Sequence, residues 1–210
     1  MDWRKEYAEK IVSVEEAVRH VQSGNRIVFT HACGEAQALT DELVRQADRL
    51  ENVEIVHMVA MGKAPYCQPG MEKHFRHNAL FVGGSTRKAV EEGRGDYTPC
   101  FFHEIPKLFT DGTLPVDVAF LQLSEPDENG VCSYGVSVDY TQPAAEAAKL
   151  VIAQINKNMP YTYGNGINLK DIDYIVEKDE PLIELQPPKI GETEHKIGEY
   201  VASLIHDGDT

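Results

Sequence analysis

The chain has 210 residues and a mass of 23.4 kDa, and its 42% hydrophobic and 26% charged residues exclude a disordered or fibrous protein. Its 34 acidic residues outnumber 20 Lys and Arg, so the net charge is −14 at pH 7. That charge repels phosphate backbones and anionic lipid headgroups, and we expect neither a nucleic-acid nor a membrane partner.

The first residues show no targeting signal. MDWRK leads into no apolar segment, and no run approaches the ~18 apolar residues of a membrane-spanning helix, so we expect a cytoplasmic protein. Four cysteines without a CxxC pair predict free thiols. Eight histidines are scattered, and His74 and His77, on one expected helix, have no third ligand near them, so we predict no metal site.

Strand and helix patterns alternate along the chain. Ser13 and Glu16 form a capping box ahead of an apolar helical stripe, and Gly24 and Asn25 end that helix before a run of β-branched and aromatic residues. The alternation predicts an α/β fold with an open, mostly parallel sheet and helices on both faces. The expected helices are 13–22, 35–50, 71–75, 85–92 and 143–149, and the expected strands are 26–30, 53–59, 79–82, 116–123 and 150–155.

Three loops follow predicted strands and hold the candidate binding residues. They are residues 31–37, 60–67 and 124–139. Ligands of parallel α/β sheets bind beyond the carboxyl ends of the strands, so we expect these loops to line a substrate cleft. The candidate substrate-binding residues are His31, Gly34, Gln37, Met61, Gly62, Ser133, Tyr134 and Gly135.

Residues of the first loop each have a functional and a structural interpretation. His31 either faces a substrate carboxylate or hydrogen-bonds within its own turn, and Gly34 either allows close backbone approach or adopts a positive φ. We expect Glu35 to cap the helix that follows, where an acid interacts favourably with the helix dipole, and Gln37 to contact a ligand. No feature supplies a base for Cys33, which we expect to be a small buried residue.

The later loops raise the same choice. Met61 offers an apolar wall for a short acyl chain, while Lys63 either pairs with an anionic substrate or is a solvated surface charge. Turn chemistry explains Asp127, which precedes the hairpin signal Asn129-Gly130. We therefore assign no acid–base role to Asp127 or Glu128, and we expect none for Asp139.

A weak internal repeat suggests a longer architecture. Residues 17–26, AVRHVQSGNR, align with residues 201–210, VASLIHDGDT, as two helix ends with similar stop signals. A strand follows the first copy, so we expect the second copy to lead into a further α/β unit; chance similarity of two helix ends is the alternative. The expected domains are 1–190 and 191–210, the latter being a linker and the first helix of a C-terminal domain. Residues 171–210 carry eleven acids against three bases.

Three separated motifs resemble those of the acetyl-CoA hydrolase/transferase family, in the same order. They are THACGE at 30–35, HMVAMGKA at 57–64 and SEPDENGVCSYGVSVD at 124–139. The similarity continues through DIDYIVE at 171–177 and EPL at 180–182. It therefore extends over nearly the whole chain and points to the N-terminal half of such proteins.

The resemblance implies a function that this chain holds only in part. Enzymes of this family move CoA between acyl groups through a glutamate that attacks the acyl-CoA and becomes a glutamyl-CoA thioester. That glutamate and the Gly-rich CoA segment belong to the C-terminal half, so the resemblance implies no catalytic residue here and no CoA transfer by this chain alone.

The same resemblance implies the ligands and partners. It indicates short-chain acyl-CoA and carboxylate substrates of the 4-hydroxybutyrate and acetate type, with CoA as co-substrate and no tightly bound cofactor. The expected partners are the C-terminal half of the same enzyme and further copies in a homo-oligomer. The alternative is a non-catalytic ligand-binding or interaction module of the same fold.

Overall fold

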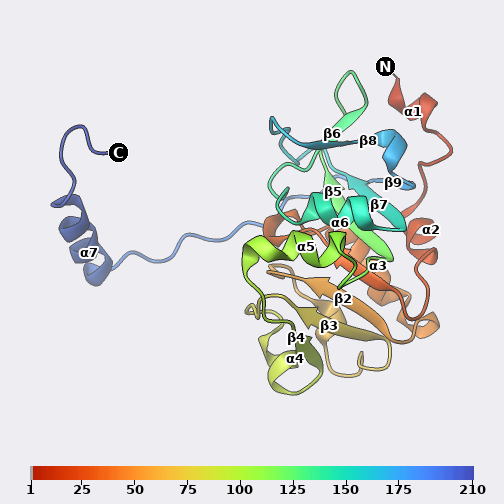
Figure 1. Ribbon diagram of the computed structural model, residues 1–210, viewed down its shortest axis with the longest axis horizontal. Coiled ribbons are helices and arrows are strands. Elements are labelled where there is room, and N and C mark those ends of the chain that lie inside the picture. Colours follow the sequence, from red (N-terminus) through yellow and green to blue (C-terminus); the bar gives the residue numbers. More distant parts are fainter. Residues whose placement is uncertain (1) are drawn as a thin grey trace.

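A seven-stranded sheet forms the centre of the molecule. In a computed structural model that describes residues 2–210, its strand order is β4-β3-β2-β1-β5-β7-β9 and its pairings are parallel (Figure 1). This confirms the predicted open, parallel α/β sheet. The strands are β1 (Arg26–Phe29), β2 (Val53–His57), β3 (Phe75–Ala79), β4 (Gly95–Tyr97), β5 (Val118–Leu123), β7 (Leu150–Ile155) and β9 (Tyr174–Glu177). A separate antiparallel pair consists of β6 (Val131–Ser133) and β8 (Gly166–Asn168).

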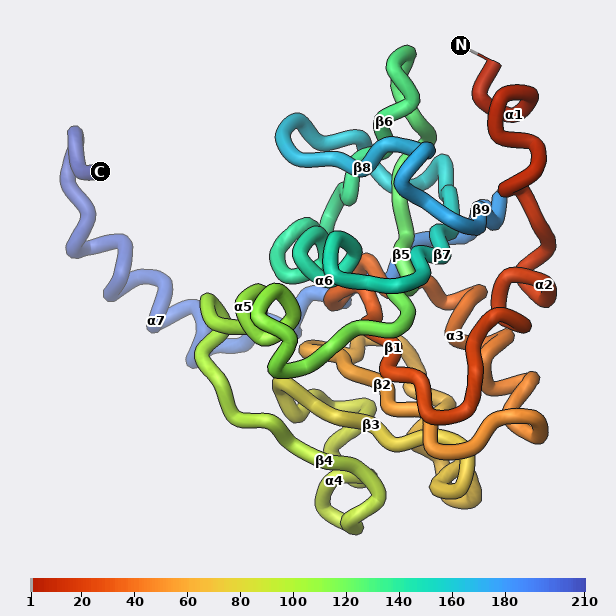
Figure 2. The backbone as a smooth tube through the Cα atoms, turned by 45° about the vertical axis from the view of Figure 1, so that its right-hand side comes forward, coloured from red at the N-terminus to blue at the C-terminus, as the bar shows by residue number. Residues whose placement is uncertain are grey.

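Helices cover both faces of the sheet, as the alternation predicts. Ile27 and Phe29 of β1 pack into one layer and Val28 into the opposite one, because successive side chains of a strand alternate. The first layer contains α2 (Val14–Arg19), α3 (Gln37–Arg45) and α4 (Arg87–Glu91), and the second contains α1 (Trp3–Glu6), α5 (Ile105–Thr110) and α6 (Thr141–Ala147). Figure 2 shows α2 and α3 on one side of the strands and α5 and α6 on the other.

The segment between β2 and β4 differs from the predicted elements. We expected a helix at 71–75 and a strand at 79–82, but turns precede β3, which occupies Phe75–Ala79. His77 therefore lies in a strand and shares no helix with His74. The strand segment FRHNA carries polar side chains that bond to neighbouring strands, so it lacks the apolar run of a buried strand.

Other differences concern boundaries and short elements. The helix expected at 35–50 ends at Arg45 and is followed by a separate 3₁₀ turn, Ala47–Arg49. Sequence patterns did not predict α1, α5, β4, β8 or β9, which have three to six residues each. Such short elements owe their structure mainly to packing against the sheet, because a single turn or three paired residues carry little periodicity.

The C-terminal segment leaves the rest of the molecule. After β9 the chain runs without regular secondary structure to α7 (Glu192–Ala202), which lies well away from the sheet (Figure 1). We term residues 2–180 the body and residues 181–210 the C-terminal arm; the arm contains no buried residue. Among residues 2–210, no helix is both long and apolar enough to cross a membrane.

Candidate functional site

The sheet reverses its strand order at β1. From β1 the chain adds β2, β3 and β4 on one side, whereas β5, β7 and β9 lie on the other. Ligands of open parallel sheets bind at such a reversal, beyond the carboxyl ends of the strands. The loops that follow β1, β2 and β5 meet there, and they are the three loops that the sequence singles out.

His31 joins the loop after β1 to the loop after β5. Its Nδ1 lies 2.7 Å from Asp139 Oδ2, and its backbone N–H donates to Ser137 Oγ at 3.0 Å. The N–H of Tyr140 donates to the other Asp139 oxygen at 2.6 Å, which fixes the carboxylate. When Nδ1 is the donor to Asp139, Nε2 is left for a ligand, as an acceptor in the neutral ring and as a donor in the protonated one.

Gly34 lets these two loops approach each other. A Cβ at this position would lie 2.7 Å from Ser137 Cβ, closer than real side chains come. Thr30 Oγ1 donates to the Gly34 carbonyl at 2.6 Å, and Gln122 Nε2 of β5 donates to the Glu35 carbonyl at 2.8 Å. The backbone of the first loop is therefore held by Thr30, which precedes the loop, and by Gln122 of the neighbouring strand β5.

The loop after β2 packs against the first loop. The Ala32 N–H donates to the Val59 carbonyl at 3.1 Å, and Cys33 Sγ lies 3.7 Å from Met61 Sδ. Cys33 is only half-buried, so the prediction that it is a buried residue is wrong. Ala32 and Ala64 have left-handed φ angles of 52° and 45°, which are uncommon outside glycine and cost free energy. Two strained positions thus flank the contact between the loops.

Glu35 lies buried beneath the second loop and is 1% exposed. One carboxylate oxygen accepts the Gly62 N–H at 3.1 Å, and a Cβ at Gly62 would lie 2.7 Å from both oxygens. Burial raises the pKa of Glu35 to about 7, and the Gly62 hydrogen bond only partly offsets it. The prediction that Glu35 caps the next helix is wrong, because α3 has Ala36 at its N-cap and no side-chain cap.

Gln37 and Lys63 lie beside Glu35. Gln37 is the first residue of α3, and Lys63 follows Gly62 in the second loop. Together with Glu35 they line a small cavity of about 30 Å³. The predicted residues Gln37 and Gly62 are therefore brought to the same place as Glu35, which sequence reasoning had given a capping role.

Ser133, Tyr134 and Gly135 are engaged elsewhere. The Ser133 hydroxyl accepts the N–H groups of Gly135 and Thr162 at 3.0 and 3.1 Å, and Tyr134 is buried. Gly135 has a φ of 59°, and a Cβ there would overlap the Met159 side chain. Among residues 2–210, no hydrogen bond joins these three residues to the loop of His31. Their assignment to a binding site stays a prediction.

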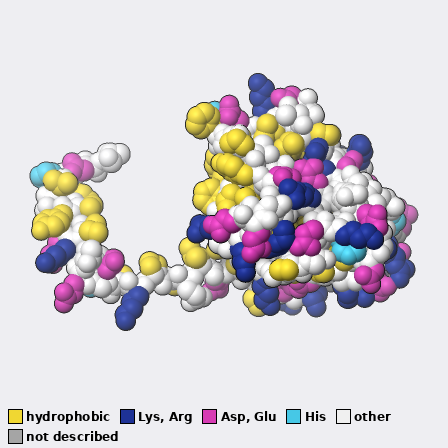
Figure 3. Space-filling view, turned by 90° about the horizontal axis from the view of Figure 1, so that it is seen from below, with side chains coloured by type: hydrophobic (Ala, Val, Ile, Leu, Met, Phe, Trp, Pro, Cys, Tyr) yellow, Lys and Arg dark blue, Asp and Glu magenta, His cyan; other side chains and the backbone are white. Residues whose placement is uncertain are grey.

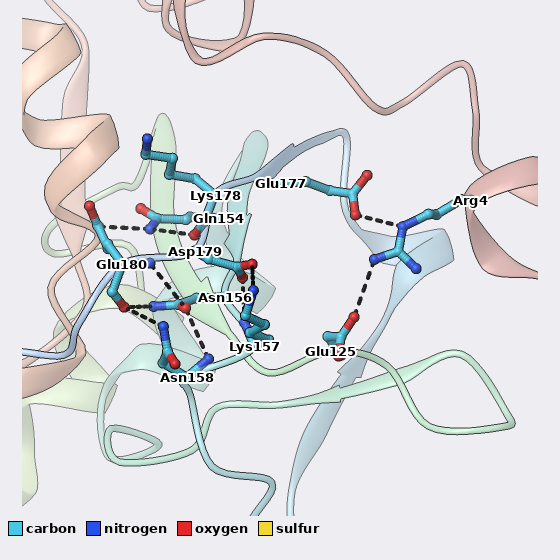
Figure 4. Close-up of polar contacts among 10 residues, drawn as sticks. All are labelled: Arg4, Glu125, Gln154, Asn156, Lys157, Asn158, Glu177, Lys178, Asp179 and Glu180. Carbon is cyan, nitrogen blue, oxygen red and sulfur yellow. Dashed lines mark hydrogen bonds and ion pairs between the residues drawn. The ribbon is translucent and has the colours of Figure 1, made fainter.

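A chain of amide side chains holds the last residue of the body, from which the arm continues, to the sheet. Asn156 Nδ2 donates to the Glu180 carbonyl at 2.8 Å, and Gln154 Nε2 donates to Glu180 Oε1 at 2.7 Å (Figure 4). Asn156 Nδ2 also donates to Gln122 Oε1 at 2.7 Å. Because Gln122 binds the Glu35 carbonyl, these amides connect the first loop to the root of the arm. Sequence patterns gave no signal for them, since their partners are distant in the chain.

An apolar rim adjoins His31. The Phe102 ring meets the His31 ring edge-on with centroids 5.7 Å apart, and Phe101 is 71% exposed. Figure 3 shows hydrophobic side chains gathered on the side of the body that faces the arm. A hollow of about 360 Å³ lies next to Phe101, and its lining residues are Tyr97, Pro99, Cys100, Phe101 and Glu104.

Two histidines beneath the site belong to the core. Burial lowers the pKa of His57 to about 3 and that of His77 to about 4, so both rings are neutral near pH 7. His57 Nδ1 lies 3.5 Å from the Tyr66 hydroxyl. Within the part of the chain that the structure describes, no three His, Cys, Asp or Glu side chains are grouped so that they could hold a metal ion.

The fold and the three loops define a class of protein, namely a parallel α/β domain with a candidate ligand site at the reversal of its strand order. The sequence profile described as the acetyl-CoA hydrolase/transferase N-terminal domain matches residues 1–186. The chain therefore belongs to the acetyl-CoA hydrolase/transferase family.

Curated relatives agree with this assignment. The chain is 60% identical to the 4-hydroxybutyrate coenzyme A transferase of Clostridium kluyveri, over 100% of this chain and 49% of that protein. It is 36% identical to the succinyl-CoA:cyclohexane-1-carboxylate CoA transferase of Geobacter metallireducens, over 98% of this chain and 47% of that protein. The chain thus spans about half the length of the curated relatives it matches.

Solved structures share the fold. The crystal structure of 4-hydroxybutyrate CoA-transferase from Porphyromonas gingivalis superposes with a TM-score of 0.81 at 38% identity, covering 100% of this chain and 49% of that one. RipA from Yersinia pestis superposes with a TM-score of 0.90 at 27% identity, covering 99% of this chain and 51% of that one. The first match confirms the predicted CoA-transferase N-terminal fold, and RipA shares that fold.

Proposed function

We propose that this chain is the N-terminal half of a CoA-transferase that moves CoA between short-chain carboxylic acids of the 4-hydroxybutyrate and acetate type. The observation that carries the proposal is the 60% identity, over the whole chain, to the 4-hydroxybutyrate coenzyme A transferase of Clostridium kluyveri. The placement of His31, Gly34, Met61 and Gly62 in adjoining loops at the strand reversal supports a substrate site there.

In this proposal the nucleophile comes from the C-terminal half of the enzyme. Its glutamate attacks the acyl-CoA carbonyl and displaces the CoA thiolate, which gives a mixed anhydride of the glutamate and the acyl group. The thiolate then attacks the glutamyl carbonyl of the anhydride, so that the first carboxylate is released and a glutamyl-CoA thioester forms. A second carboxylate takes up CoA by the same two steps in reverse. The present chain forms one wall of the cleft. His31, oriented by Asp139, presents Nε2 to a substrate oxygen, and Met61 offers an apolar surface to the acyl chain.

The charge and the apolar rim suggest how the halves divide the work. A net charge of −14 disfavours binding of the phosphates of CoA to this chain, so the C-terminal half makes most of the contacts with CoA. The exposed aromatic rings around Phe101 and Phe102 are the surface on which that half packs next to His31. We further propose that the intact enzyme is a cytoplasmic homo-oligomer without a tightly bound cofactor.

A fusion protein tests the proposal. Residues 1–210 are joined to the C-terminal half of the Clostridium kluyveri relative, and CoA transfer from acetyl-CoA to 4-hydroxybutyrate is measured, with the intact relative as positive control. We expect transfer by the fusion and none by residues 1–210 alone. Thioester exchange by the isolated chain would contradict the proposal, as would a folded fusion that shows no transfer.

A further inference from the structure

Met61 lies between two fixed backbone groups. On one side the Ala60 carbonyl accepts the Ser85 hydroxyl at 2.5 Å, and on the other the Gly62 N–H donates to Glu35 at 3.1 Å. The first of these bonds is neutral and does not titrate near pH 7, whereas the second ends on a carboxylate. The position of Met61 therefore depends on one bond that is constant and on one that can change.

Glu35 differs from a second buried glutamate on the same side of the sheet. Glu42 of α3 is 6% exposed, and Arg45 donates to both of its oxygens at 2.6 and 2.7 Å. Glu35 is 1% exposed, and no Lys or Arg within residues 2–210 makes an ion pair with it. A buried carboxylate without a cation is costly, and such groups concentrate at functional sites.

The titratable groups that face Glu35 do not neutralise it. Asp41 of α3 adds a negative charge nearby, and Lys63 lines the same small cavity without pairing with the carboxylate. The other groups are uncharged near neutral pH, because burial raises the pKa of each; they are Tyr66, Cys67 and Tyr140. The Gly62 N–H is therefore the main group that responds to the charge of Glu35.

We propose that Glu35 is a positioning residue of this site, whose buried carboxylate holds the loop of Met61 through the Gly62 amide more firmly when it is charged than when it is neutral. The inference deepens the proposed function and rests on it where substrate is concerned. Glu35 acts through Met61 and the loop backbone, and it need not contact the substrate.

The expected consequence is a substrate affinity that depends on pH. A carboxylate accepts an N–H bond more strongly than a neutral carboxyl group does, and Glu35 exchanges its proton near pH 7. The loop is therefore held most firmly above pH 7 and loosened below it. The KM for the acid substrate should fall about fivefold between pH 6 and pH 8, while kcat changes less than about twofold.

The first experiment needs no activity. In the chain of residues 1–210 labelled with ¹⁵N, the amide resonance of Gly62 is followed from pH 5.5 to pH 8.5. We expect an inflection near pH 7 that is absent in Glu35→Gln and retained in the matched control Glu42→Gln. A Gly62 resonance that does not titrate in the unaltered chain would overturn the proposal, even if Glu35→Gln failed to fold.

The second experiment uses the fusion protein with its C-terminal half. Its KM for 4-hydroxybutyrate should lose the pH dependence in Glu35→Gln and stay near the high value of the low-pH form, while Glu42→Gln follows the unaltered fusion. A Glu35→Gln profile identical to the unaltered one would overturn the inference and leave the proposed function intact. An inactive fusion with a titrating Gly62 would overturn the proposed function and the substrate part of this inference, while the loop contact stands.

Discussion

The body and the C-terminal arm contain similar apolar residues, but only the body has a core. All six residues of β5 are buried, whereas α7 has eleven residues and buries none of them. An isolated helix of that length is marginal in water without a packing surface. The difference teaches that the body holds its structure through its own contacts, while α7 needs a surface that the rest of residues 2–210 does not supply in this structure.

The largest expected effect is on the free energy of unfolding, and it is found by comparing one substitution in the body with one in the arm. Ile27→Ala removes a fully buried side chain from β1 and should lower the free energy of unfolding by about 2–5 kcal/mol. Ile197→Ala changes a residue of α7 that is 57% exposed and should shift it by less than about 0.5 kcal/mol. Urea unfolding of both variants measures this, and equal losses would show that the arm packs on the body.

A pH series sharpens the comparison, since buried Glu35 belongs to the body. Its pKa is raised from 4.5 to about 7, so the folded state keeps a proton that the unfolded state loses. The contribution of Glu35 is therefore most favourable below about pH 4.5 and falls by about 3 kcal/mol as the pH rises to 7.

The measurement is the difference in unfolding free energy between Glu35→Gln and the unaltered chain from pH 4.5 to pH 8. The difference should grow in favour of Glu35→Gln as the pH rises, whereas Glu199→Gln in α7 should give a flat line. His57 and His77 act in the opposite direction, because their lowered pKa values destabilise the fold as the pH falls below 6.5. They are present in every variant and cancel in the comparison, so a flat line for Glu35→Gln would refute a raised pKa.

A smaller effect is expected where the two regions join. Glu180→Ala removes the carboxylate that accepts Gln154 Nε2, and the buried amide then lacks that partner, which should cost about 1–3 kcal/mol. The exposed Glu184 lies four residues further along the arm, and Glu184→Ala should leave the thermal midpoint unchanged. A similar midpoint for both variants would mean that the amide chain does not anchor the arm.

Sequence patterns predicted the fold where burial was uniform. Four strands are short, mostly apolar runs, a pattern typical of a strand that is covered on both faces; they are β1, β2, β5 and β7. β3 was misplaced because its polar side chains have specific partners: Arg76 pairs with Asp96 at 2.5 Å, and Asn78 donates to Glu54 at 2.8 Å. Those partners lie in other strands, so no local pattern reveals them.

The candidate site was also predicted only in part, because some of its contacts join segments that are distant in the sequence. His31 and Gly62 follow predicted strands, so the sheet topology alone placed them at the carboxyl edge. Asp139 was assigned no role, because its contact with His31 depends on β5 lying beside β1. Glu35 was given a capping role because no sequence pattern indicates that its side chain turns toward Gly62. The missed residues are those whose role depends on contacts between distant segments.

The most direct test of the account is the effect of His31 on CoA transfer by the fusion protein. His31→Ala should lower kcat/KM for 4-hydroxybutyrate at least about tenfold, because the ring held by Asp139 at the strand reversal is lost. His20→Ala, an exposed histidine at the end of α2, should leave kcat/KM within about twofold of the unaltered fusion. Equal rates for the two variants would contradict the claim that the loops at this edge form the substrate site.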